Sequence, residues 1–133
     1  RDVSLGFESG FQPMLDAMRK HFRLDDIRRA SWLLTDHGIR RMGFLMLGGP
    51  GETRASVEAS LAFADALDLD AVKLTVGVRI YPDTEVARIA LREGVIRPDD
   101  DLLFPRFYIA DGLEAWLRGT VRAWMAPRSH WMP

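Results

Sequence analysis

Hydrophobic and polar positions alternate with a period of two in the first residues of the chain. Val3, Leu5 and Phe7 fall on one face, and small or polar residues fall on the other. This alternation predicts a strand over residues 2–8. Residues 41–47 form a mostly apolar run that ends in glycines, which predicts a buried strand covered on both faces. Residues 71–80 alternate again, so we expect a third strand there.

Between these segments, apolar residues recur at helical spacing. The predicted helices carry their apolar stripes at Leu15, Met18 and Phe22; at Ile27, Ala30 and Leu34; at Val57, Leu61, Ala64 and Leu67; and at Val86, Ile89 and Ala90. Thr53 is the predicted N-cap of the third helix, and Gly38 is predicted to end the second. The order β, α, α, β, α, β, α predicts an α/β fold with parallel strands joined by right-handed crossovers.

The pattern changes after Gly94. Residues 103–108 are aromatic and interrupted by proline, which is more typical of a packed loop than of a central strand. Asp111 is the predicted cap of a last helix that buries Leu113, Trp116, Leu117, Val121 and Trp124. The tail after Pro127 has no pattern. We therefore divide the chain into an α/β region, 1–96, and a loop and helix extension, 97–133.

Composition excludes several classes of protein. The chain has 133 residues, a net charge of −1, no cysteine and no apolar run long enough to span a membrane. Without cysteine there are no disulfides and no thiolate metal sites in this chain. The near-zero charge gives no electrostatic indication of nucleic-acid binding. We expect a soluble, cytoplasmic protein without a signal peptide or membrane partner.

Candidate chemistry lies where the predicted strands end. Glu8, the Gly48–Gly51 turn and Arg79 would share one rim of a parallel sheet. Glu8 and Arg79 could equally form a structural ion pair. The turn has neither a Walker lysine nor the GxGxxG pattern, so a plain tight turn and a phosphate or nucleotide contact remain alternatives. We predict that Glu8, Gly48 and Arg79 surround one concavity.

Three segments resemble the second half of a radical S-adenosylmethionine domain. They are Ser4-Leu5-Gly6-Phe7-Glu8-Ser9-Gly10, Gly48-Gly49-Pro50-Gly51-Glu52-Thr53 and Arg79-Ile80-Tyr81-Pro82-Asp83-Thr84, and they occur in the family's order and spacing. The most similar subgroup contains cobalamin-binding Fe–S oxidoreductases and methylthiotransferase-like proteins. The resemblance covers residues 2–96 and implies a parallel half-barrel, the second half of a partial TIM barrel, with outer helices and a C-terminal helical extension.

The resemblance also implies a set of residues that bind S-adenosylmethionine. Glu8 takes the position that contacts the ribose hydroxyls, and Lys20 the basic position that contacts the carboxylate end. Met46 takes the apolar position beside the adenine. The remaining implied contacts are Gly48, Gly49, Gly77, Arg79 and Tyr81. Phe44 departs from the polar or small residue of some relatives, which puts the adenine contacts in doubt. No residue of this chain is predicted to be catalytic.

In the family, a reduced [4Fe–4S] cluster cleaves S-adenosylmethionine, and the resulting radical abstracts hydrogen from a substrate. The cysteine loop that ligates the cluster is absent from this sequence. We therefore expect an inactive fragment whose partner is the N-terminal half of the barrel. The substrate of the parent protein is unidentified, and cobalamin is a possible further cofactor of that parent. An exposed sheet edge could pair two copies. The alternative functions are a non-catalytic nucleotide- or phosphate-binding module and an interaction domain.

Overall fold

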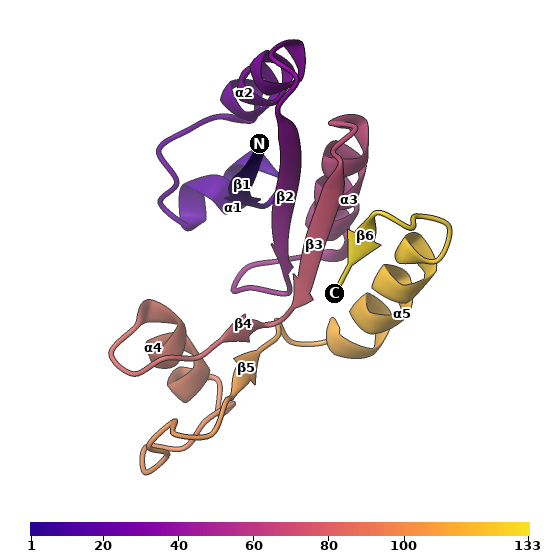
Figure 1. The fold of residues 1–133 in the computed structure, drawn as a ribbon. Helices are drawn as coiled ribbons and strands as arrows, with labels where there is room; N and C mark the ends of the chain where they lie inside the picture. The colour runs from indigo at the N-terminus through magenta and orange to yellow at the C-terminus, as the bar shows by residue number, and fades with distance from the viewer.

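The computed structural model describes residues 1–133, and strands and helices alternate through most of the chain (Figure 1). In chain order the elements are β1 (Asp2–Glu8), α1 (Gln12–Ala17), α2 (Leu24–Asp36), β2 (Arg40–Leu47), α3 (Arg54–Ala66), β3 (Ala71–Val76), β4 (Val78–Arg79), α4 (Glu85–Arg92), β5 (Phe107–Tyr108), α5 (Glu114–Met125) and β6 (Trp131–Met132). No helix has the length and apolar character that crossing a membrane would require.

Four parallel strands form the main sheet, in the order β1-β2-β3-β6. The three predicted strands are confirmed as parallel neighbours in chain order. Each pair is joined through helices, as a parallel connection requires. The sheet is open at both edges, and neither a barrel nor a half-barrel is seen in this chain.

The third predicted strand is shorter than its alternation suggested. β3 ends at Val76, and Gly77 turns the chain with a φ of 87°. The following β4 leaves the main sheet and pairs antiparallel with β5. We call the segment from β4 to β5 the arm, because it extends away from the main sheet (Figure 1). Gly77 breaks the strand at a conformation that side-chain-bearing residues rarely adopt, so the prediction of one strand to residue 80 is wrong.

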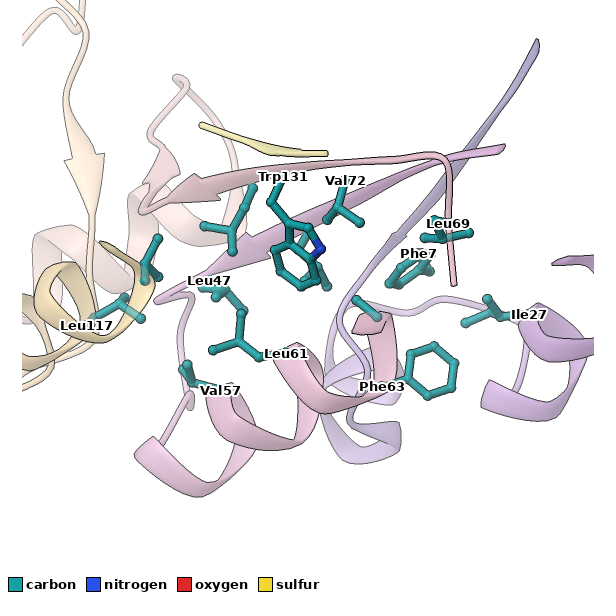
Figure 2. Close-up of a cluster of buried hydrophobic side chains, with 14 of the residues drawn as sticks. Phe7, Ile27, Leu47, Val57, Leu61, Phe63, Leu69, Val72, Leu117 and Trp131 are labelled. Atoms are coloured by element: carbon teal, nitrogen blue, oxygen red, sulfur yellow. The ribbon is translucent and has the colours of Figure 1, made fainter. Parts of the chain in front are cut away.

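The main core lies on one face of the sheet. Leu45 and Leu47 of β2 and Val72 and Leu74 of β3 are at most 1% exposed. Figure 2 shows these strands packing on α3, with further side chains from α2, α5 and β6. The core residues labelled there are Phe7, Ile27, Leu47, Val57, Leu61, Phe63, Leu69, Val72, Leu117 and Trp131.

The opposite face of the sheet is largely uncovered. Met42, Phe44 and Met46 of β2 are only partly buried, and Lys73 and Thr75 of β3 are exposed. The prediction that residues 41–47 are covered on both faces is therefore wrong. The core helices α2, α3 and α5 pack on the other side. On this side, which we call the open face, only Met46 near the end of β2 has residues of α1 and α4 close to it.

The arm has a small core of its own. Ile80, Ala90, Ile96 and Tyr108 are buried there, away from the main core. The Tyr108 hydroxyl donates to Glu93 at 2.7 Å, and burial followed by that carboxylate raises the pKa of Tyr108 to about 12. The arm is therefore a separately packed unit joined to the sheet at Gly77 and near residue 110.

The C-terminal extension differs from its prediction in two places. The last helix starts after Leu113, and Asp111 does not cap it. The unpatterned tail forms β6, which pairs with β3. Arg128 fixes this tail, because its guanidinium donates to Asp65 of α3 at 2.8 and 3.0 Å and lies 4.2 Å from the centre of the Trp124 ring.

Candidate functional site

The end of β1 forms a charged corner. Glu8 has a φ of 65°, and the register with β2 is irregular between Leu5 and Glu8. Lys20, just after α1, donates from Nζ to the Gly6 carbonyl oxygen at 3.3 Å. Burial raises the pKa of Glu8, and the Lys20 charge opposes that rise. A positive φ at a non-glycine residue is a strained conformation that concentrates at functional sites, so this corner is the first candidate for ligand contacts.

The glycine turn after β2 is organised from inside by Glu52. This side chain is 5% exposed. Its Oε2 accepts from the Gly48 backbone N–H, and its Oε1 accepts from the Ser56 hydroxyl, both at 3.0 Å. Burial raises the pKa of Glu52, and these hydrogen bonds oppose the rise. Thr53 then caps α3 as predicted, with its side chain accepting from Ser56 N.

The position of Glu52 bears on the alternative of a phosphate site. A phosphate at such a turn would need free backbone N–H groups and the positive end of the helix dipole. Here the Gly48 N–H already donates to a carboxylate that lies just before the α3 N-terminus. A negative charge inside the turn repels a second anion, so this geometry disfavours phosphate binding.

The third predicted segment starts at Gly77 and runs into the arm. Gly77 N donates to the Leu47 carbonyl oxygen at 2.7 Å, which ties this segment to the end of β2. Arg79 is exposed, and its guanidinium carbon lies 4.8 Å from the centre of the Tyr81 ring, which is itself 52% exposed. Arg79 forms no ion pair with Glu8; the nearest cation affecting that carboxyl is Lys20.

A cleft of about 510 Å³ lies between α1, the glycine turn, β4 and α4. Met46 and Gly49 are the predicted site residues that line it. The cleft is not lined by the other predicted site residues, which are Glu8, Lys20, Gly48, Gly77, Arg79 and Tyr81. The predicted site residues therefore lie in separate groups. Glu8 lies near Lys20, and Met46 and Gly49 line the cleft. Gly77 is hydrogen-bonded to Leu47, the residue before Gly48, and Arg79 lies against the Tyr81 ring.

Sequence reasoning assigned no role to two residues of this region. Glu52 belongs to the segment 48–53 that resembles the family, but no pattern in the sequence singles it out. Arg19 lines the cleft and has a φ of 56° directly after the C-cap of α1. The signal that could have found Arg19 is the lack of glycine where a short helix must end.

The donor set of this chain does not fit an iron–sulfur cluster. Such clusters are held by cysteine thiolates, and the chain contains no cysteine. It also contains no group of three or more His, Asp or Glu side chains placed to hold a metal ion. S-adenosylmethionine is a better match, because its diol, carboxylate and adenine would need an acceptor, a cation and an apolar wall, which Glu8, Lys20 and Met46 could supply.

Comparison with known proteins finds a sequence relative that is a methyltransferase and a structural neighbour that is a radical S-adenosylmethionine methyltransferase. It is 29% identical over 94 residues to the Uncharacterized methyltransferase PH0819 of Pyrococcus horikoshii, a match that covers 71% of this chain and 20% of that protein. No family model matches the chain.

Comparison with solved structures shows a similar fold. The radical S-adenosylmethionine methyltransferase TsrM of Kitasatospora setae superposes with a TM-score of 0.78 over 99% of this chain. The identity is 20% in the complex with tryptophan substrate and a cofactor analogue, and 21% in the complex with cobalamin and a [4Fe–4S] cluster. The chain spans a third of TsrM and a fifth of the curated relative. It therefore has the fold of part of such an enzyme.

Proposed function

We propose that this chain is part of a radical S-adenosylmethionine enzyme of the transferase type and forms one wall of its S-adenosylmethionine site. The observation that carries the proposal is the corner at the end of β1, where a strained Glu8 lies beside Lys20. The similarity to a methyltransferase sequence and the TsrM fold support it. A carboxylate and an ammonium at adjoining positions suit the opposite ends of one cofactor.

Each residue then has a distinct task. Glu8 accepts hydrogen bonds from the two ribose hydroxyls, which its ionised carboxylate can do with both oxygens. Lys20 holds the carboxylate of the methionine moiety. Met46 and Gly49 form the apolar surface against the adenine. The remaining members, Gly48, Gly77, Arg79 and Tyr81, shape the adjoining segments.

The contribution of this chain is orientation and exclusion of water. The [4Fe–4S] cluster of such an enzyme supplies the electron that cleaves S-adenosylmethionine, and its thiolate ligands would come from outside these 133 residues. We likewise assign no residue of this chain to cobalamin binding. The open face and the free edge of β1 are the surfaces on which we expect the rest of the enzyme to complete a barrel, with pairing of two copies through that edge as the competing arrangement.

The proposal is tested by reconstituting two proteins with iron and sulfide under reducing conditions. The intact protein should bind a cluster and release 5′-deoxyadenosine from S-adenosylmethionine. The 133-residue chain alone should bind no iron, form no product and bind the cofactor weakly, because an open wall leaves hydrogen bonds exposed to water, where they contribute little net free energy. Stoichiometric cluster binding by this chain alone, or an intact protein without either property, would overturn the proposal.

A further inference from the structure

The cleft between α1 and α4 has mainly apolar walls. Its volume of about 510 Å³ is in the range of sites that enclose a small organic molecule. The apolar side chains that line it come from four elements or turns: Met14 and Met18 from α1 and its C-cap, Met46 from β2, Val78 from β4, and Val86 and Ile89 from α4. Methionine side chains adapt to ligand shape and make favourable contacts with aromatic rings.

Two arginines also line the cleft, and they are in different states. Arg88 is engaged by Glu85, whose Oε2 accepts from its Nε and contacts its second guanidinium nitrogen, both at 2.9 Å. Arg19 is an exposed residue at the mouth of the cleft, and its guanidinium has no hydrogen-bond or ion-pair partner within the chain. The cleft therefore contains one uncommitted cation beside apolar walls.

The backbone of Arg19 adds an independent observation. Its φ of 56° places it in the left-handed region, directly after the α1 C-cap Met18. Glycine is the usual residue at this position, because it adopts that conformation without strain. Glycines end α2 and α4 in this way, at Gly38 and Gly94. Asp68 holds the corresponding position after α3 with a φ of 49°, so the strained backbone of Arg19 supports a role for its side chain only together with its place in the cleft.

We propose, on the basis of the function proposed above, that the α1–α4 side of this cleft, beside the adenine wall of Met46 and Gly49, binds the enzyme's substrate and that the substrate is an apolar or aromatic carboxylic acid whose carboxylate is held by Arg19. The planar guanidinium can donate two parallel hydrogen bonds to a carboxylate. Lys20 does not compete for it, because its ammonium is turned to the Gly6 carbonyl beside Glu8. The two neighbouring cations thus serve different ligands, Lys20 the cofactor and Arg19 the substrate.

The test uses the intact protein with ¹³C-labelled methionine methyl groups and two probes, 3-phenylpropionate and its uncharged isostere 3-phenylpropanamide. Both should shift the signals of Met14 and Met18, which line the α1 side of the cleft. The acid should bind at least about tenfold more tightly than the amide, as a charge-assisted pair predicts. In Arg19→Gly that preference should disappear, while the melting temperature stays equal or rises because glycine relieves the left-handed strain.

Three further measurements make the result decisive. Arg92→Gln, an exposed arginine of α4 that does not line the cleft, should keep the preference for the acid. Arg19→Asn, a residue that also tolerates the left-handed region, replaces the glycine variant if that one does not fold. Affinity for S-adenosylmethionine should be unchanged in both Arg19 variants, which separates this proposal from the cofactor site.

Equal binding of acid and amide to the wild type, an unchanged preference in the Arg19 variants, or probe shifts only at methionines outside the cleft would overturn the proposal. Failure of the proposed cofactor function would appear instead as absent S-adenosylmethionine binding in the wild type, with the preference for the acid intact.

Discussion

The two faces of the main sheet are built from the same strands and have opposite surroundings. On β3, Leu74 is 1% exposed against the helices, whereas the next residue back, Lys73, lies exposed on the open face. Both faces belong to the same hydrogen-bonded strands, so the difference in side-chain exposure comes from what packs on each face. The covered face stabilises the fold, and the open face is the surface on which we propose that the rest of the enzyme packs.

The largest effect that separates the two faces should come from Leu74→Ala. Truncating a fully buried leucine removes apolar contacts and leaves a cavity, so we expect a loss of about 2–5 kcal/mol in the free energy of unfolding. Urea denaturation followed by circular dichroism measures it. A loss below about 1 kcal/mol would mean that the covered face is not the core of the fold.

Glu52 sharpens the comparison, because it is buried where the sheet meets the glycine turn. Glu52→Ala leaves the Gly48 N–H and the Ser56 hydroxyl without their acceptor, and we expect a loss of about 1–3 kcal/mol in unfolding free energy. Glu58→Ala, which removes an exposed acid on the adjoining helix α3, is the control and should change little. Equal losses in the two variants would show that Glu52 does not hold the turn.

The same residue predicts a pH dependence. Burial raises the pKa of Glu52 in the folded state, so the folded protein holds this proton more tightly than the unfolded chain. The stability that protonated Glu52 contributes is therefore fully present below pH 4.5, the ordinary pKa, and is lost as pH rises through the raised pKa of the folded state. Relative to wild type, Glu52→Gln should gain stability as pH rises from 4 to 7. A constant difference between the two proteins across this range would contradict the raised pKa.

The smallest effect should come from Lys73→Ala on the open face. Substituting an exposed side chain that makes no structural contact usually changes the unfolding free energy by less than about 0.5 kcal/mol. Denaturation alongside Leu74→Ala, its neighbour in the strand, compares the two faces with the backbone position almost fixed. A loss in Lys73→Ala close to that in Leu74→Ala would remove the distinction between the faces.

Sequence patterns predicted the regular parts of this fold. Alternation in residues 2–8 and 71–80, the apolar run 41–47 and helical spacing between them predicted three parallel strands and their helices. Alternation could not locate the end of β3, because Val78 and Ile80 continue the period after Gly77 has turned the chain. It could not find β6 either, because a two-residue strand has no period and is fixed by Arg128 and its contact with Asp65, 63 residues away in sequence.

The surroundings of β2 show a second limit of the sequence. Met42, Phe44 and Met46 are apolar, like the core residues between them, so their pattern indicated burial on both faces. Burial depends on which elements are present to cover a face, and none of these residues specifies that. For the site, the ends of the strands were predictable from topology, whereas the roles of Glu52 and Arg19 depend on side-chain directions and backbone dihedral angles that only the structure provides.

Calorimetric titration of S-adenosylmethionine into the intact protein tests the central claim most directly. Glu8→Ala should weaken binding by about 1–3 kcal/mol, the range for losing charge-assisted hydrogen bonds, with little change in melting temperature. Glu58→Ala, the exposed acid on α3, should bind as the wild type does. Unchanged affinity in Glu8→Ala, measured on a folded protein that binds the cofactor, would contradict the assignment of this corner to S-adenosylmethionine.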